Sequence, residues 1–82
     1  MTSEKQLEKA KKEITERLYK KFMVKYNGNK SRFAKDAHCD EKTIRLIFDN
    51  GQGMTLNLMF KLCFALEISP SELLKGLQLK SE

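Results

Sequence analysis

Apolar residues recur along this chain at helical spacing, and the clearest repeat lies near its middle. Two short patterns follow one another there, spaced i, i+1, i+4 and then i, i+3, i+4: Phe33, Ala34 and Ala37, followed by Ile44, Ile47 and Phe48. Each pattern predicts a helix with one buried face. Only residues 38–40 separate the two predicted helices, so these helices must cross and share one core, as they do in a helix-turn-helix motif.

Polar residues at the ends of these patterns predict where the two helices begin and end. Asn29 is expected to cap a helix over 30–37, and Asp40 a helix over about 41–48. In each case the side-chain oxygen should accept an amide of the first turn. Residues 49–53 predict a loop, because Asn-Gly and a second glycine favour left-handed backbone.

A long helix is predicted upstream of the motif. Ser3-Glu4-Lys5-Gln6 has the form of a capping box, and Asn27-Gly28 ends the helix after about Tyr26. Its apolar stripe consists of Leu7, Ala10, Ile14, Leu18 and Phe22, widened by Tyr19, Met23 and Tyr26. Residues 1–12 contain few apolar residues and many lysines, so we expect them to protrude or fray as a helical extension.

Two further helices are predicted downstream. Thr55 should cap a helix over about 56–66, whose core residues are Leu58, Met59, Leu62, Cys63, Ala65 and Leu66. Ser69, with proline next and glutamate three residues later, predicts another helix start, which Gly76 ends. Residues 77–82 form a tail, either packed on the domain or part of a dimer interface. The chain, residues 1–82, is therefore predicted to be a single all-α domain with its helix-turn-helix core at about 29–50.

The stretch from Asn29 to Asn50 resembles the helix-turn-helix of the Cro/C1-type, or XRE-type, regulators of the phage repressor family. In that family a Leu-Ala pair opens the motif, a glycine lies in the turn, and apolar positions anchor the recognition helix. The matching residues here are Phe33-Ala34, His38, Cys39, Ile44 and Ile47. Residues 55–74 resemble the next two helices of the family. The resemblance covers roughly 19–74 and implies a five-helix lambda-repressor-like DNA-binding domain, here with an extended N-terminal helix.

The resemblance also implies roles for the polar residues of the motif. The helix over 41–48 would enter the DNA major groove, where basic, acidic and apolar side chains read different base edges. The residues expected to read bases are Glu41, Lys42, Arg45 and Leu46. Those expected at the DNA backbone are Asn29, Lys30, Arg32, Asp40, Thr43, Asn50, Gly51 and Gln52. The alternative interpretation is a set of solvated charges on exposed helix faces, followed by a flexible connector.

Some residues of the motif depart from the family pattern. His38 replaces the turn glycine, and we expect it to adopt a positive φ, which histidine tolerates better than most residues. Asp40 and Glu41 place negative charge at the end of the helix that would enter the groove, and Leu46 is apolar where a polar residue is more usual. These departures leave the preferred base sequence open.

The net charge gives only mild support to the DNA-binding role that the resemblance implies. The chain carries +5, and residues 1–27 hold eight Lys or Arg against four Glu. Residues 54–82 are balanced, with three charges of each sign. A basic N-terminal half suits a surface that faces phosphates, although a solvated Lys/Glu helix produces the same excess.

The sequence lacks the features that mark membrane proteins, exported proteins, metal sites and common enzymes. The chain has no run of about 18 apolar residues and no apolar signal-peptide core, so we expect a cytoplasmic protein without a membrane span. Cys39 and Cys63 lack metal-ligand spacing and are interpreted as packed thiols, and no cofactor is expected. An enzyme is not expected either, because the chain has one histidine and no glycine-rich phosphate loop.

Three functions are consistent with these features. The leading prediction is a sequence-specific transcriptional regulator that binds double-stranded DNA as a homodimer, on half-sites about one helical turn apart. The alternative is an antitoxin-like or accessory regulator of the same fold whose main partner is another protein. The third is a helical interaction module without a DNA role. For residues 1–12, a dimer contact or a basic arm near DNA are the alternatives to a fraying extension.

Overall fold

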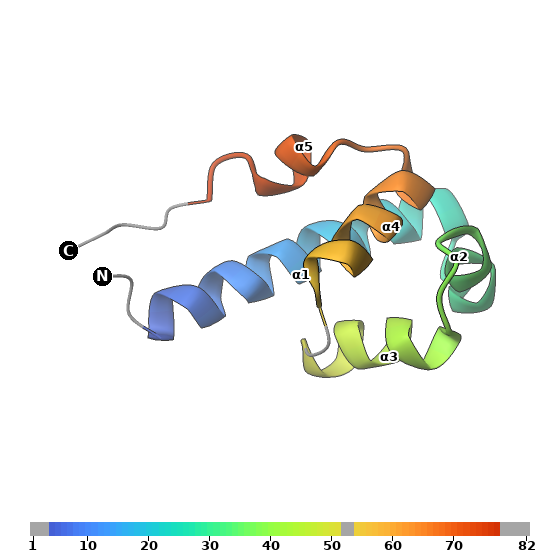
Figure 1. The fold of residues 1–82 in the computed structure, drawn as a ribbon, viewed down its shortest axis with the longest axis horizontal. Helices are drawn as coiled ribbons and strands as arrows, with labels where there is room; N and C mark the ends of the chain where they lie inside the picture. Colours follow the sequence, from blue (N-terminus) through green and yellow to red (C-terminus); the bar gives the residue numbers. More distant parts are fainter. Residues whose placement is uncertain (1–3, 52–53, 78–82) are drawn as a thin grey trace.

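A computed structural model describes residues 4–51 and 54–77, which form five helices and no strand. The helices are α1 (Glu4–Tyr26), α2 (Lys30–Asp36), α3 (Glu41–Asn50), α4 (Leu56–Leu66) and α5 (Pro70–Leu74). Figure 1 shows α1 spanning the molecule, with α5 above it, α3 below it and α2 near its C-terminal end. The predicted all-α, five-helix architecture is confirmed.

Three helices begin with the side-chain caps that the sequence predicts. Asn29 Oδ1 accepts the Arg32 amide at 3.1 Å at the start of α2. Thr55 Oγ1 accepts the amide of residue 58 at 3.1 Å, and Ser69 Oγ accepts the amide of residue 72 at 3.2 Å. Because these bonds satisfy amides that have no partner within the helix, each cap defines a helix start locally.

The cap of α3 is different from the prediction. Asp40 has the extended backbone of an N-cap residue, but its carboxylate makes no capping hydrogen bond. The amide of Thr43 instead donates to the Asp40 carbonyl at 3.0 Å. The prediction that α3 ends near residue 48 was also wrong, because the helix continues to Asn50 and Gly51 follows with φ 65°. The predicted loop over 49–53 is therefore shorter, and residues 52 and 53 lie outside the described part.

One continuous core holds the five helices together. It consists of Leu18, Phe22, Tyr26, Phe33, Ala34, Ala37, Ile44, Ile47, Leu58, Met59, Leu62, Cys63, Ala65, Leu66 and Leu73. The Phe22 ring lies at its centre and is fully buried, with ring centroids of Phe33 at 5.1 Å and Phe48 at 5.2 Å. These rings come from α1, α2 and α3, so one aromatic cluster joins the long helix to both helices of the motif.

The N-terminal part of α1 is a regular helix from Glu4 and extends away from the core. Ala10 is buried, whereas Leu7 is 42% exposed and the side chains of residues 8, 9, 11 and 12 are exposed. The expected extension is thus helical over 4–12, and residues 1–3 lie outside the described part. Further along, the Arg17 guanidinium donates to the Leu73 and Lys75 carbonyls, which holds α5 against α1.

Tyr26 ties the end of α1 to two other helices. Its buried hydroxyl lies 2.8 Å from Asp36 Oδ2, to which it donates, and 3.1 Å from the Ala65 carbonyl oxygen. Burial, followed by the hydrogen bond to Asp36, raises the pKa of Tyr26 to about 12. The neutral phenol is therefore the form that the folded chain favours.

Alkaline pH should weaken the fold through Tyr26. The unfolded chain releases the phenolic proton near pH 10.0, whereas the folded chain keeps it to about 12. The stability that the neutral phenol of Tyr26 gives to the fold is therefore fully present below pH 10. About 1–2 kcal/mol of it is lost as the pH rises from about 10 to 12. In urea denaturation across this pH range, the free energy of unfolding should fall less steeply with pH in Tyr26→Phe than in the wild type. Tyr19→Phe, at a ring that is 43% exposed, should follow the wild type; equal slopes in wild type and Tyr26→Phe would contradict the prediction.

Candidate nucleic-acid interface

The turn between α2 and α3 is formed by backbone hydrogen bonds that reverse the chain within three residues. The amide of His38 donates to the Lys35 carbonyl at 3.2 Å, and the amide of Cys39 donates to the Ala34 carbonyl at 3.0 Å. This pair of bonds is the Schellman arrangement, which requires a left-handed residue after the helix. His38 supplies it with φ 56°, as predicted. Ala37 is fully buried beneath the turn.

Glycine at position 38 should be neutral or stabilising. A left-handed residue that carries a Cβ costs about 1 kcal/mol, and His38→Gly removes that cost while adding unfolded-state entropy. We expect the melting temperature to rise by 0 to about 6 °C. His38→Ala is the control, because alanine removes the imidazole and keeps the strained Cβ. A clear loss of stability in His38→Gly, measured by thermal circular dichroism, would argue against this account of the turn.

Helix α3 presents one face to the core and the other to solvent. Ile44 and Ile47 are buried and Phe48 packs against the core, which holds the helix firmly. On the outward side Lys42, Arg45 and Leu46 are exposed, and Leu46 remains 40% accessible despite being apolar. Three of the four residues predicted to read bases are therefore accessible along one helix at the edge of the molecule (Figure 1).

The fourth residue, Glu41, is half-buried and is paired with Arg45. The Arg45 guanidinium and the Glu41 carboxylate form an ion pair one helical turn apart on the outward side of α3. An exposed pair of this kind is worth only about 0.3–0.5 kcal/mol, so a stronger acceptor can displace it. Glu41 thus orients Arg45 in the free chain and also reduces the positive charge of this face.

The basic residues of α2 lie on different sides of the helix. Lys30 lines a shallow hollow with Phe48 and Asp49, next to the C-terminal half of α3. Arg32 instead lies near Tyr26, where its charge opposes the rise in the tyrosine pKa. Of the two predicted phosphate contacts on α2, Lys30 lies beside both α1 and the C-terminal half of α3, whereas Arg32 lies near Tyr26 at the end of α1.

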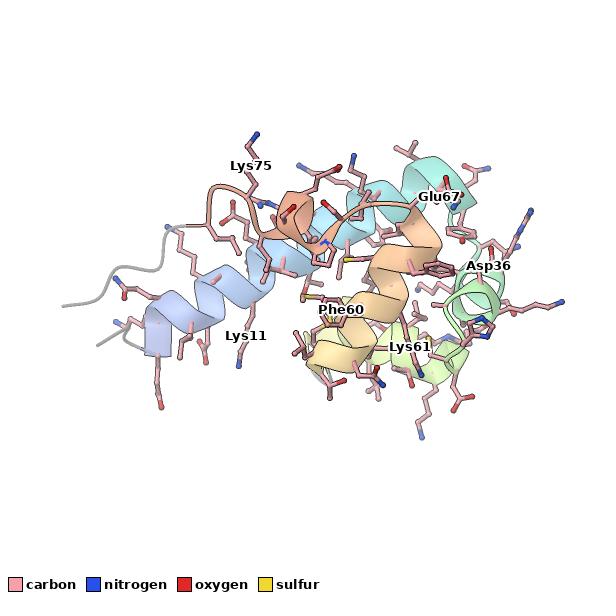
Figure 2. The ribbon with its side chains drawn as sticks, turned by 45° about the horizontal axis from the view of Figure 1, so that its top comes forward. Lys11, Asp36, Phe60, Lys61, Glu67 and Lys75 are labelled. Carbon is pink, nitrogen blue, oxygen red and sulfur yellow. The ribbon has the colours of Figure 1, made fainter. Side chains whose placement is uncertain are left out.

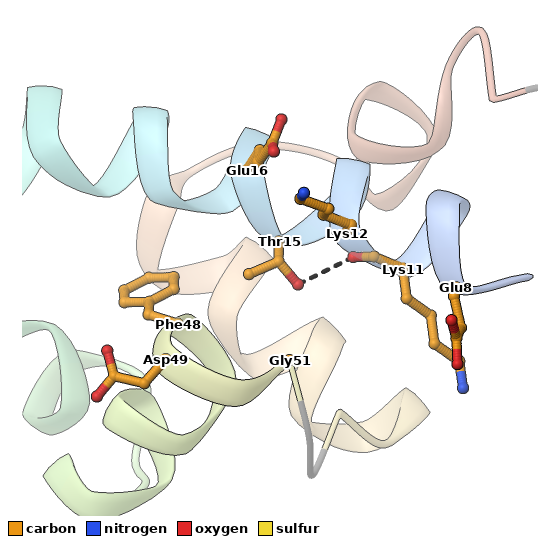
Figure 3. A pocket seen from close by; sticks show the side chains of 8 residues that line it. All are labelled: Glu8, Lys11, Lys12, Thr15, Glu16, Phe48, Asp49 and Gly51. Carbon is orange, nitrogen blue, oxygen red and sulfur yellow. Dashed lines mark hydrogen bonds between the residues drawn. The ribbon is translucent and has the colours of Figure 1, made fainter. Parts of the chain in front are cut away.

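A second hollow, of about 610 Å³, separates the N-terminal part of α1 from the end of α3 (Figure 3). Its walls carry the carboxylates of Glu8, Glu16 and Asp49 and the amines of Lys11 and Lys12. Thr15 Oγ1 donates to the Lys11 carbonyl at 2.9 Å, so its hydroxyl proton is already used within α1. With mixed charges and this occupied hydroxyl, the hollow has no arrangement typical of a nucleophile and its base.

The remaining predicted backbone contacts are only partly accessible. Asn29 and Asp40 are exposed and Thr43 is half-buried. The Gly51 amide donates to the Ile47 carbonyl at 2.9 Å, so it is not free for a phosphate as the predicted loop would have allowed. Asn50 belongs to α3, while Gln52 lies outside the described residues.

Lys61 is a basic residue at the motif that the sequence analysis did not identify. It comes from α4, and its amine donates to the His38 carbonyl at 3.4 Å. Its charge also acts on Cys39, whose thiol pKa is raised by burial and lowered in part by this lysine. No local sequence signal indicates this placement, because it depends on how α4 packs against the turn.

Both cysteines pack in or against the hydrophobic core: Cys63 is buried and Cys39 is partly buried. Burial raises the pKa of the Cys63 thiol as it does that of Cys39, so both favour the neutral form. Among the described residues, no three His, Cys, Asp or Glu side chains gather as metal ligands would. Over the same part of the chain, no helix combines the length and apolar character of a membrane span.

Comparison with known proteins extends these observations. The family model for the Cro/C1-type HTH DNA-binding domain matches residues 20–76, which include all of α2, α3, α4 and α5. No curated protein and no solved structure matched the chain. The first 19 residues lie outside the match, in agreement with an α1 longer than the family requires. Together with the helix-turn-helix geometry over Asn29–Asn50, the match shows that this chain belongs to the family of Cro/C1-type helix-turn-helix DNA-binding domains.

Proposed function

We propose that this chain is a sequence-specific transcriptional regulator that inserts α3 into the major groove of double-stranded DNA. A DNA-binding domain of this family points to a regulator rather than an enzyme. The observation that carries the proposal is the outward side of α3, where Lys42, Arg45 and Leu46 are exposed while the opposite side is anchored in the core. Base reading requires such a rigid helix with accessible side chains of several chemical kinds.

Each outward residue of α3 suits a different base. Arg45 can donate two hydrogen bonds to the O6 and N7 atoms of guanine once it leaves Glu41, and Lys42 can donate to the same edge. Leu46 can pack on the methyl group of thymine, and the Glu41 carboxylate can accept from the N4 amine of cytosine. The pairing of Glu41 with Arg45 makes the two roles dependent on each other.

Contacts to phosphate would position α3 in the groove. Lys30 is the best placed side chain, because it lies beside the C-terminal half of α3. Asn29, Asp40 and Thr43 lie at the starts of α2 and α3, where a groove-bound helix passes close to the DNA backbone. Arg32 has a smaller part in this proposal, since it lies near Tyr26 and does not line the hollow beside α3.

Two copies would act together on one operator. A single α3 reads only a few base pairs, so useful affinity needs two reading helices on half-sites about one helical turn apart. The net charge of +5 is modest for a DNA-binding chain and strengthens this requirement.

Selection of bound sequences from random DNA, followed by anisotropy titration, tests the proposal. The full chain should enrich a motif with two-fold symmetry. If each of the two chains contacts four phosphates, eight in all, affinity for the operator should fall by about 10⁴-fold between 50 and 200 mM salt. No enrichment together with no salt-sensitive binding would overturn the proposal. Co-purification of a stoichiometric protein partner by a chain that enriches no motif would favour the accessory-regulator alternative.

A further inference from the structure

Helix α4 carries a row of large apolar side chains that the core does not use. Leu56, Phe60 and Phe64 are 66%, 49% and 76% exposed. Their i, i+4, i+8 spacing places them next to one another along one side of α4, and we call this row the α4 stripe. The other apolar residues of α4 are buried on the opposite side. Exposed rows of this size on a small domain mark interaction surfaces.

We propose that the α4 stripe is the surface through which two copies of this chain pair on DNA, an inference that rests on the proposed function. The stripe is self-complementary when two α4 helices pack antiparallel about Phe60. Phe60 then lies against Phe60 of the second copy, and Leu56 lies against Phe64. Such an isologous contact buries the same residues on both chains, as a two-fold dimer requires.

Charge favours a second copy over other occupants. Lys61 is the only charged residue between Leu56 and Leu66, and its amine is directed to the His38 carbonyl rather than along the stripe. The stripe itself is uncharged, so it offers no ion pair to a phosphate backbone or to an acidic or basic peptide. A matching uncharged aromatic surface is available on every other copy of the chain.

The position of the stripe keeps it apart from the helix proposed to enter the DNA groove. Figure 1 shows α4 in front of α1 and α3 along the lower edge, and in Figure 2 Phe60 lies on the near side of α4. The stripe therefore lies on a different helix from the outward residues Lys42, Arg45 and Leu46 of α3. Pairing through the stripe therefore uses none of the residues proposed to read bases on α3.

The size of the stripe predicts a dimer that is weak without DNA. The three side chains expose roughly 400 Å² per copy, against about 800 Å² per partner in a standard stable interface. Neighbouring half-sites raise the effective concentration of the two chains and so complete the pairing. The free chain should therefore be largely monomeric at micromolar concentration and bind a two-half-site DNA cooperatively.

Two glutamate substitutions and a charge-matched control test the stripe. In Phe64→Glu and Phe60→Glu, affinity for DNA with two half-sites should fall at least tenfold more than affinity for a single half-site. Val24→Glu changes the charge equally at a residue of α1 that is 86% exposed, and it should keep the cooperativity. Because residue 60 lies on the two-fold axis, mixing Phe60→Glu with Phe60→Lys should restore cooperative binding, which a misfolded variant could not do.

The outcomes separate this inference from the proposed function. Cooperative binding that survives in both glutamate variants would overturn the α4 interface while leaving DNA binding intact. A wild-type chain that binds DNA without cooperativity would overturn it as well. If the wild type binds no DNA, the proposed function fails and sedimentation equilibrium at about 1 mM protein decides the interface. A wild-type dimer that both glutamate variants abolish would support it, and a monomer would overturn it.

Discussion

Phe22→Ala is expected to destabilise the domain by about 3–5 kcal/mol, which is most or all of the stability of a chain this small. The Phe22 ring is fully buried and contacts the rings of Tyr26, Phe33 and Phe48. Its removal leaves a cavity at the meeting point of α1, α2 and α3. Because those helices hold the motif, the same change should abolish DNA binding at 37 °C. Urea denaturation followed by circular dichroism measures the loss.

An exposed phenylalanine supplies the control for this prediction. Phe64 is 76% exposed on α4, so Phe64→Ala should change the free energy of unfolding by less than about 0.5 kcal/mol. Phe22→Leu should fall between the two, since leucine fills part of the cavity. Similar losses in Phe22→Ala and Phe64→Ala would show that the aromatic cluster does not hold the three helices together.

Arg45→Ala is expected to weaken binding to the selected DNA site by about 1–3 kcal/mol per copy, or about 5- to 150-fold for each Arg45 that is lost. Arg45 is exposed on α3, and in the free chain it forms only a weak surface ion pair with Glu41. Preference for one base at the contacted position should also relax, because a bidentate contact to guanine is lost. Anisotropy titration against the selected site and its single-base variants measures both effects.

Two further variants distinguish base reading from simple charge loss. Lys75→Ala removes the same charge at an exposed residue that Figure 2 shows on the side of α5, far from α3, and it should weaken binding less than threefold. Glu41→Gln should raise affinity for unrelated DNA, because it removes a negative charge and releases Arg45. At a site where Glu41 accepts from cytosine, the loss of that contact should offset the gain. If Arg45→Ala and Lys75→Ala weaken binding equally at all sites, Arg45 does not read a base.

Much of the fold was predictable because its determinants are local. Asn29, Thr55 and Ser69 cap the helices that the sequence assigns to them, and each capping bond spans only three residues. The six residues of α4 that the sequence assigns to the core are all buried. His38 could be assigned a positive φ because it stands where the resembled family has its turn glycine, and the structure gives it φ 56°.

The candidate site was less predictable, because several of its features depend on contacts between distant segments. Lys61 reaches the turn from α4. Lys30 and Arg32 are two residues apart, yet Lys30 lies beside the end of α3 and Arg32 lies near Tyr26. The Asp40 carboxylate was expected to cap α3 and does not, and α3 continues through Asn50 to a left-handed Gly51. Residue preferences for caps and turns express average tendencies, which packing overrides at particular positions.

By itself, the sequence determined the helices, the turn and the residues that form the core, since helical period, capping and burial preference act over a few neighbouring residues. Only the tertiary structure decided which side of each helix is left for partners. Leu56, Phe60 and Phe64 have the same apolar character as the buried residues of α4. They remain exposed because no other helix of the described chain covers that side of α4, and exposure depends on packing rather than on residue type.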